Sequence, residues 1–185
     1  MKKKLGAYIT LGAIALIAAA ILVMYLVPVS YMPAMSKPIN ITVYQTSTKY
    51  GTFSPESGTE NYNKVYDAYN QSFGQNFLSA LFAGQTKAAS SQNASGQLST
   101  TTSAPSYSTY LVLNFNAQKI TVNGHKQNVS VDQVIVQVQN TTTFADVKVY
   151  FKQAGTTGTT TYYYMTTLAK QAALYELITN LSIPE

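Results

Sequence analysis

Residues 110–138, YLVLNFNAQKITVNGHKQNVSVDQVIVQV, carry the clearest structural pattern in this 185-residue chain. Leu111, Leu113 and Phe115 occupy every second position, which is the period of a strand with one buried face. Asn123-Gly124 follows, and this dipeptide between two apolar stretches is the strongest short signal for a β-hairpin. The stretch therefore predicts two long antiparallel strands joined by a tight turn.

The returning strand of this hairpin changes its alternation. Val129 and Val131 fall on one parity, whereas Val134 and Val136 fall on the other. A one-residue shift moves every following side chain to the opposite face, so a buried strand tolerates it only at a bulge or a turn. We predict such an irregularity at Asp132–Gln133.

Outside the hairpin, the patterns predict further strands and two helices. Residues 40–50, 147–151 and 159–165 are rich in β-branched and aromatic residues, as strands are. A helix over 60–82 would open at a capping box, Ser57-x-x-Glu60, and an amphipathic helix over 167–181 would close the chain. The predicted fold class is α+β: an antiparallel sheet or small sandwich of five or six strands within residues 40–185, flanked by two helices.

The first predicted helix carries an aromatic stripe at helical spacing. Its members are Tyr62, Val65, Tyr66, Tyr69, Phe73, Phe77, Leu81 and Phe82. Packing against the sheet is the favoured interpretation, and a ligand-stacking groove is the alternative. Glu60 and Lys64, four residues apart, are expected to pair on the helix surface. Residues 85–106 contain almost no large apolar side chain, so we predict a flexible loop there.

The N-terminal region has the features of a membrane helix. Ala7 to Val27 is a 21-residue apolar run, long enough to cross a hydrocarbon core of about 30 Å as a helix. Lys2, Lys3 and Lys4 precede it, which predicts a cytoplasmic leader at 1–6 and an exterior C-terminal part. Pro28 ends the run, and residues 28–39 are expected to form a Pro-containing extended linker.

Composition excludes several classes of function. All 12 basic residues are lysine, and those beyond the apolar run are scattered, so we expect no nucleic-acid binding. Cysteine is absent, which removes disulfides and thiolate metal sites. The one histidine, His125, follows the predicted turn and has no carboxylate close to it in sequence. We therefore expect no metal, no cofactor and no enzymatic activity.

Sequons for N-glycosylation are more frequent than chance predicts. Six sites fit Asn-x-Ser/Thr, where about two or three are expected from the Asn, Ser and Thr content. They are Asn40, Asn70, Asn93, Asn128, Asn140 and Asn180. All six follow the apolar run, as an exterior, glycosylated domain requires. Asn70, on the predicted helix, is expected to be the least accessible.

These features predict a single-pass, glycosylated exterior protein of the cell membrane, without enzymatic activity, that acts as a structural or accessory subunit of a cell envelope, membrane complex or virion envelope. Lipid would contact residues 7–27, and protein partners or further copies would bind at the surface. The low charge, the absence of Arg and Cys and the abundance of Tyr, Thr and Asn are similar in style to surface proteins of thermoacidophilic archaea and their viruses.

Three alternatives stay open. The Lys-Lys-Lys-Leu5-Gly6 leader resembles that of archaeal type IV pilins, which implies cleavage after Gly6 and a filament core built from the apolar helix. Small residues at Ala34-Met35-Ser36 also suit removal of the helix as a secretory signal. The third alternative is an exterior module that binds sugar or protein through tyrosines 162–164 or the aromatic stripe.

Overall fold

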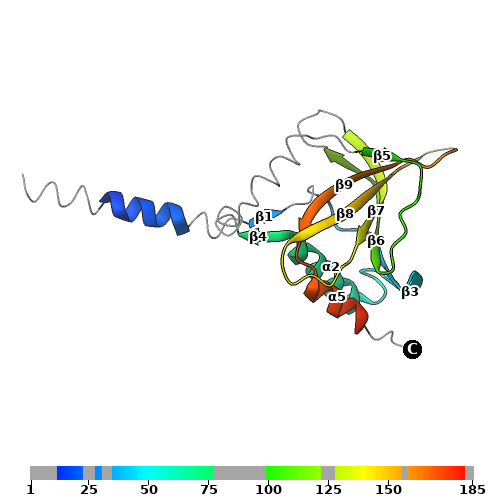
Figure 1. Ribbon diagram of the computed structural model, residues 1–185, viewed down its shortest axis with the longest axis horizontal. Helices are drawn as coiled ribbons and strands as arrows, with labels where there is room; N and C mark the ends of the chain where they lie inside the picture. The colour runs from blue at the N-terminus through cyan, green and yellow to red at the C-terminus, as the bar shows by residue number, and fades with distance from the viewer. Residues whose placement is uncertain are drawn as a thin grey trace, which may run out of the picture.

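The computed structural model describes residues 12–22, 28–30, 35–76, 99–121, 128–155 and 158–181. Within these ranges the fold is α+β, with three helices and a seven-stranded antiparallel sheet (Figure 1). The strand order in this sheet is β3-β2-β6-β7-β8-β9-β5, and a separate two-stranded sheet pairs β1 with β4. The predicted class is confirmed, but the strands form one large sheet with helices on it, so the sandwich alternative is wrong.

The elements have the following bounds. The strands are β1 Pro28–Ser30, β2 Asn40–Gln45, β3 Thr48–Phe53, β4 Gly74–Asn76, β5 Ser99–Thr101, β6 Tyr110–Thr121, β7 Asn128–Gln137, β8 Ala145–Gln153 and β9 Tyr162–Ala169. The labelled helices are α2 Thr59–Phe73 and α5 Ala172–Thr179, and an N-terminal helix covers residues 12–22.

The predicted central hairpin is confirmed by the pairing of β6 with β7, which places Thr121 opposite Asn128. The Asn123-Gly124 turn itself lies outside the described residues. The predicted irregularity at Asp132 is also present, because the register of β7 against β8 shifts between Val131 and Gln133. The register of β6 against β7 also shifts, between Asn114 and Gln118. The change of parity between Val131 and Val134 follows from this shift.

The prediction of one strand over 40–50 is wrong, because this stretch folds into the hairpin of β2 and β3. Thr46 and Ser47 form the turn with positive φ angles of 51° and 64°. Such angles favour Gly or Asn, and neither residue stands at this turn, so no turn was predicted here. Two contacts hold the turn in place: the Ser47 amide donates to the Ser108 carbonyl at 2.8 Å, and its hydroxyl donates to the Tyr107 carbonyl at 3.2 Å.

The first predicted helix is shorter than expected and begins differently. It ends at Phe73, and Gly74 is already extended with φ −102° and ψ 143°. At its start, Gly58 adopts the left-handed conformation and no side chain caps the helix, so the predicted capping box is wrong. The Glu60 side chain pairs instead with Lys64 at 2.5 Å, as expected. Positions 77, 81 and 82 of the aromatic stripe lie outside the described residues.

The predicted loop over 85–106 is wrong in part. Residues 99–101 form β5, which pairs with Tyr162–Tyr164 at the edge of the sheet. An edge strand can be held by backbone hydrogen bonds alone. The sequence of β5 therefore needs few apolar residues and shows no strand pattern. Residues 85–98 lie outside the described part of the chain. With β3 and β5 added, the sheet has more strands than the predicted five or six.

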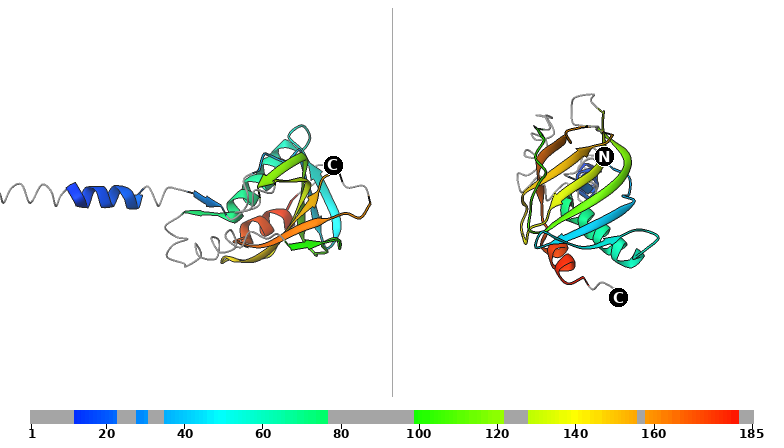
Figure 2. Two further views of the ribbon diagram at one scale, coloured as in Figure 1. Left: turned by 90° about the horizontal axis from the view of Figure 1, so that it is seen from above. Right: turned by 90° about the vertical axis from the view of Figure 1, so that its right-hand side faces the viewer.

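The hydrophobic core lies between the sheet and helices α2 and α5. Alternate residues of the central strands point to this side, which we call the inner face, and they are almost fully buried. The sheet curves around α2, and α5 lies beside it (Figure 2). The inner face and the two helices contribute Ile41, Val43, Tyr62, Val65, Phe73, Leu111, Leu113, Val134, Val136, Val147, Val149, Phe151, Leu174 and Ile178, among others.

The N-terminal helix stands apart from this core (Figure 1). All of residues 12–22 are exposed, including five large aliphatic side chains: Ile14 at 61%, Leu16 at 74%, Ile17 at 60%, Ile21 at 49% and Leu22 at 59%. In the part of the chain that the structure describes, no helix is both long and apolar enough to cross a membrane. The rest of the predicted span, residues 7–11 and 23–27, lies outside the described residues.

Candidate functional site

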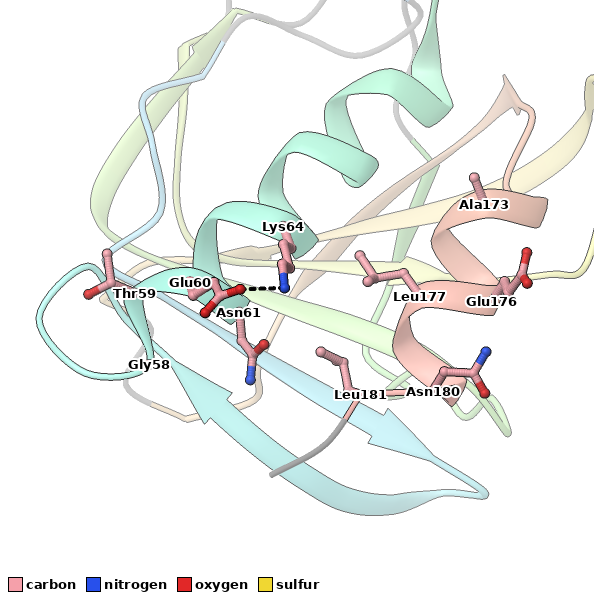
Figure 3. Close-up of a pocket in the computed structure, with 10 residues that line it drawn as sticks. All are labelled: Gly58, Thr59, Glu60, Asn61, Lys64, Ala173, Glu176, Leu177, Asn180 and Leu181. Carbon is pink, nitrogen blue, oxygen red and sulfur yellow. Dashed lines mark ion pairs between the residues drawn. The ribbon is translucent and has the colours of Figure 1, made fainter. Parts of the chain in front are cut away.

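A groove opens between the first turns of α2 and the end of α5. Its volume is about 820 Å³. Figure 3 shows the two helices facing each other across it, with side chains from both pointing toward the opening. It is lined by Gly58, Thr59, Glu60, Asn61, Lys64, Ala173, Glu176, Leu177, Asn180 and Leu181.

The groove exists because both helices bury only one side against the sheet. Leu174 and Ile178 of α5 are buried, whereas Leu177 is half-buried and forms the apolar wall of the groove. The end of α5 is fixed by the β2–β3 hairpin: the Gln45 amide donates to the Ile178 carbonyl, and the Tyr50 hydroxyl donates to the Leu181 carbonyl. The position of the groove is therefore set by the sheet edge.

The polar rim of the groove is exposed and weakly charged. The Lys64 side chain donates a hydrogen bond to Glu60, and together with its positive charge this lowers the pKa of Glu60 below the ordinary 4.5. Glu176 and Asn180 are exposed on the opposite side. Such a rim suits weak polar recognition over an apolar wall. Among the described residues no three His, Cys, Asp or Glu side chains gather closely enough to hold a metal ion, and His125 is not among those residues.

The aromatic stripe of α2 belongs to the core, as favoured above. Tyr62, Val65, Tyr69 and Phe73 are buried, and Tyr66 is partly buried against them. The Tyr62 hydroxyl donates to the Pro38 carbonyl at 2.6 Å, whereas the buried Tyr69 hydroxyl has no hydrogen-bond partner among the residues that the structure describes. Burial raises the pKa of both phenols. The described part of the stripe therefore does not form a ligand groove.

Several of the other described tyrosines gather on the opposite side of the sheet, which we call the tyrosine face. Tyr44 stacks on Tyr110 with ring centroids 4.3 Å apart, and Tyr150 stacks on Tyr164 at 5.3 Å. Tyr107 packs against Tyr150, and its burial raises its pKa. All five rings are half-buried. The predicted tyrosine run is thus divided: Tyr163 packs against the core, while positions 162 and 164 alternate to the other side.

An amide ladder crosses the same face. The Asn114 amide donates to the Asn40 side-chain oxygen at 2.6 Å, and the Gln133 amide donates to the Asn114 oxygen at 2.9 Å. The Lys152 ammonium lies 3.5 Å from Asp132, at the bulge. This face therefore presents hydroxyls, amides and few charges.

The predicted glycosylation sites fall into three groups. Asn70, Asn140 and Asn180 are exposed, on α2, in the loop after β7 and at the end of α5, so the expectation that Asn70 is the least accessible is wrong. Its position on the outward side of α2 explains this, since Tyr69 takes the buried side. Asn40 is half-buried in the amide ladder. Asn93 lies outside the described residues, and for Asn128 only the backbone pairing is described.

The chain matches no protein-family model, no curated protein and no solved structure. The interpretation of its sites therefore rests on geometry alone. Among the groove residues, sequence patterns singled out the Glu60–Lys64 pair and the sequon Asn180, but not their common position. The groove itself joins residues more than 100 positions apart, and no local pattern in the sequence signals that.

Proposed function

We propose that this protein is an exterior domain held at the cell membrane by its N-terminal helix, and that it acts as a structural or accessory surface protein without enzymatic activity. The observation that carries the proposal is the N-terminal helix, in which every residue from 12 to 22 is exposed. Its five large aliphatic side chains are each between 49% and 74% exposed.

Exposed apolar area on this scale requires another covering environment. Burial of apolar surface is worth roughly 25 cal/mol per Å², and a soluble domain rarely exposes a contiguous patch of more than a few hundred Å². The 21-residue apolar run that contains this helix has the length that a bilayer covers. Lipid therefore accounts for the run, and its lysine flank supports a cytoplasmic N-terminus.

Contacts of the residues that follow the run support retention of the helix. β1 pairs with β4, Met35 packs against the core, and the Ser36 amide donates to the Gln118 side chain at 3.2 Å. Cleavage at Ala34-Met35-Ser36 would separate β1 from the domain and remove these contacts. We therefore favour a retained anchor over a secretory signal.

The exposed sequons support the exterior placement of the domain. Asn70, Asn140 and Asn180 are accessible on the folded surface, as acceptor sites for glycans require. The abundant hydroxyl and amide side chains keep the surface wet with little charge, and the tyrosine face offers a surface for protein partners.

The test is extraction and intact-mass analysis of the native protein. We expect the protein to stay in membranes washed with alkaline carbonate, to be released only by detergent, and to carry hexose-containing adducts on peptides with Asn70, Asn140 or Asn180. A variant lacking residues 1–27 should appear in the soluble fraction. Release of the full chain by carbonate would contradict the proposal.

The same exposed helix favours one second candidate, a filament subunit. In a filament, the helices of many copies would cover one another, and the leader would be cleaved after Gly6. The intact mass separates the two: loss of residues 1–6 supports the filament, and an intact N-terminus excludes it. Electron microscopy of surface fractions provides the independent check.

The third candidate, an exterior module that binds sugar or protein, is supported only by the half-buried rings and the amide ladder of the tyrosine face. Tyrosine fluorescence titration with neutral and acidic polysaccharides tests it, because the chain has no Trp to mask the signal. Absence of any change with these glycans would leave a protein partner as the ligand class for this face.

A further inference from the structure

The connection between the N-terminal helix and the sheet domain is held by contacts with both α2 and the sheet. β1, which begins directly after the apolar run, pairs in antiparallel register with β4, which directly follows α2: Pro28 lies opposite Asn76, Val29 opposite Gln75 and Ser30 opposite Gly74. Figures 1 and 2 show this small sheet on the side of the domain that faces the N-terminal helix. It ties the start of the connection to the end of α2.

Residues 35–39 make a second set of contacts farther along α2. The Tyr62 hydroxyl donates to the Pro38 carbonyl at 2.6 Å in a buried position, and the Ile39 amide donates to the Asn114 carbonyl at 2.8 Å. The Lys37 ammonium lies 5.6 Å from the centre of the Tyr66 ring. These contacts attach the connection to both α2 and β6, so its second half is part of the fold.

The two sets of contacts define a direction for the domain. The β1–β4 sheet lies at the C-terminal end of α2, whereas the groove is formed by residues 58–64 at its N-terminal end. A 15-residue helix is about 22 Å long, so the groove and the β1–β4 sheet lie at opposite ends of the helix layer. Figure 1 agrees, because the end of α5 lies farther from the N-terminal helix than β1 and β4 do.

We propose that these contacts form a two-part clasp, the β1–β4 sheet and residues 35–39, that fixes the domain on the end of its membrane helix with the groove facing away from the membrane. The inference rests on the proposed membrane attachment. Only about 20 Å of extended chain can separate Leu22 from Pro28, so a domain held by the clasp stays close to the bilayer. The clasp holds the groove in one orientation relative to the membrane.

A disulfide trap tests the first part of the clasp, because the natural chain has no cysteine. Residues directly opposite each other in an antiparallel pair have Cβ atoms close enough for a disulfide, whereas a diagonal pair two residues away does not. In the full chain, V29C with Q75C should therefore form a disulfide on the order of tenfold faster than the matched off-register pair, S30C with N76C. Equal rates would overturn the pairing. Circular dichroism of both reduced variants confirms that they are folded.

Spin labels test whether the domain is fixed. The full chain, reconstituted in phosphatidylcholine nanodiscs, carries labels on A19C in the N-terminal helix and D67C on α2, both exposed positions. We expect a narrow distance distribution that broadens in Q75P, which removes an amide from the β1–β4 sheet, and stays narrow in the matched Q75A variant. A wild-type distribution as broad as that of Q75P overturns the clasp.

The results also separate the clasp from the proposed function. If the disulfide forms rapidly but carbonate releases the protein from membranes, the β1–β4 half of the clasp is supported and the membrane anchor is contradicted. A broad distance distribution in a protein that stays in the membrane would contradict only the clasp.

Discussion

The two faces of the seven-stranded sheet are built from the same strands and yet have different chemistry. In β8, Val147, Val149 and Phe151 point to the inner face and are fully buried. Tyr150, between them, points to the tyrosine face and is half-buried. The inner face is stabilised by apolar area that two helices remove from water, whereas the tyrosine face combines ring stacking and amide hydrogen bonds with two buried aliphatic residues, Val112 and Ile135. The inner face therefore buries more apolar side chains than the tyrosine face does.

The largest expected effect compares neighbouring residues of β8. Phe151→Ala removes a fully buried ring and leaves a cavity, so the free energy of unfolding should fall by about 3–5 kcal/mol. Tyr150→Ala removes a half-buried ring from a stack and should lower it by about 1 kcal/mol. Urea unfolding followed by circular dichroism measures both. Equal losses in the two variants would mean that side chains on the tyrosine face contribute as much to the free energy of unfolding as those on the inner face.

A buried amide gives the next largest effect. Gln171 is fully buried. Its side-chain oxygen accepts a hydrogen bond from the backbone amide of Gln139, and its side-chain nitrogen donates one to the backbone carbonyl of Gln137, both at 3.0 Å. Gln171→Ala leaves both backbone groups unpaired and should lower the free energy of unfolding by about 2–3 kcal/mol.

The matched control for Gln171 is Gln133 in the amide ladder of the tyrosine face, where water can replace the lost partner. Gln133→Ala should lower the free energy of unfolding by less than about 1 kcal/mol. A larger loss in Gln133→Ala than in Gln171→Ala would contradict the contrast between the two faces.

Two tyrosines of α2 separate hydrogen bonding from packing within the core itself. Tyr62→Phe removes a buried hydrogen bond and leaves the Pro38 carbonyl unpaired, so it should lower the free energy of unfolding by about 1–2 kcal/mol. Tyr69→Phe removes a buried hydroxyl that has no partner and should be neutral or slightly stabilising. Thermal unfolding of the two variants provides the comparison. A marked loss in Tyr69→Phe would show that this hydroxyl is hydrogen-bonded, for example to a buried water.

At high pH, the two faces should respond alike. Burial raises the pKa of Tyr69 on the core side and of Tyr107 on the tyrosine face above the ordinary 10.0. A phenol whose pKa is raised in the folded state contributes stability that is fully present below pH 10 and is lost as the pH rises toward the folded pKa. We expect the melting temperature to fall above about pH 10, and Tyr107→Phe should reduce that fall.

The smallest expected effect is the response to acid. Lys64 lowers the pKa of Glu60, so this pair contributes stability above the ordinary pKa of 4.5, and the contribution is lost as the pH falls through the folded value. Glu60 is fully exposed, so the effect is small, and Glu60→Gln should remove it. The polar residues that are described as buried carry hydroxyls and an amide, which do not titrate in acid, and the one carboxylate with a buried oxygen, Asp132, lies beside Lys152. A melting temperature that drops steeply between pH 7 and pH 4 would contradict this view.

Local patterns predicted the parts of the fold that follow from nearest neighbours. The alternation in residues 110–138 identified the β6–β7 hairpin, and the parity change among its valines located the bulge at Asp132. The same approach missed the turn at Thr46–Ser47, because its positive φ angles are held by contacts with residues 107 and 108 rather than by a Gly or Asn. It missed β5 for a similar reason, since backbone pairing with β9 needs no apolar side chain.

By itself, the sequence determined the α+β class, the central hairpin, the aromatic stripe of α2 and the exposed apolar run, because each follows from the periodicity or the hydropathy of adjacent residues. Only the tertiary structure decided which tyrosines are core and which form a surface, that α2 and α5 enclose a groove, and that residues 28–30 and 35–39 contact the domain. These features depend on contacts between residues far apart in the chain, and a local sequence pattern does not specify which distant residues come into contact.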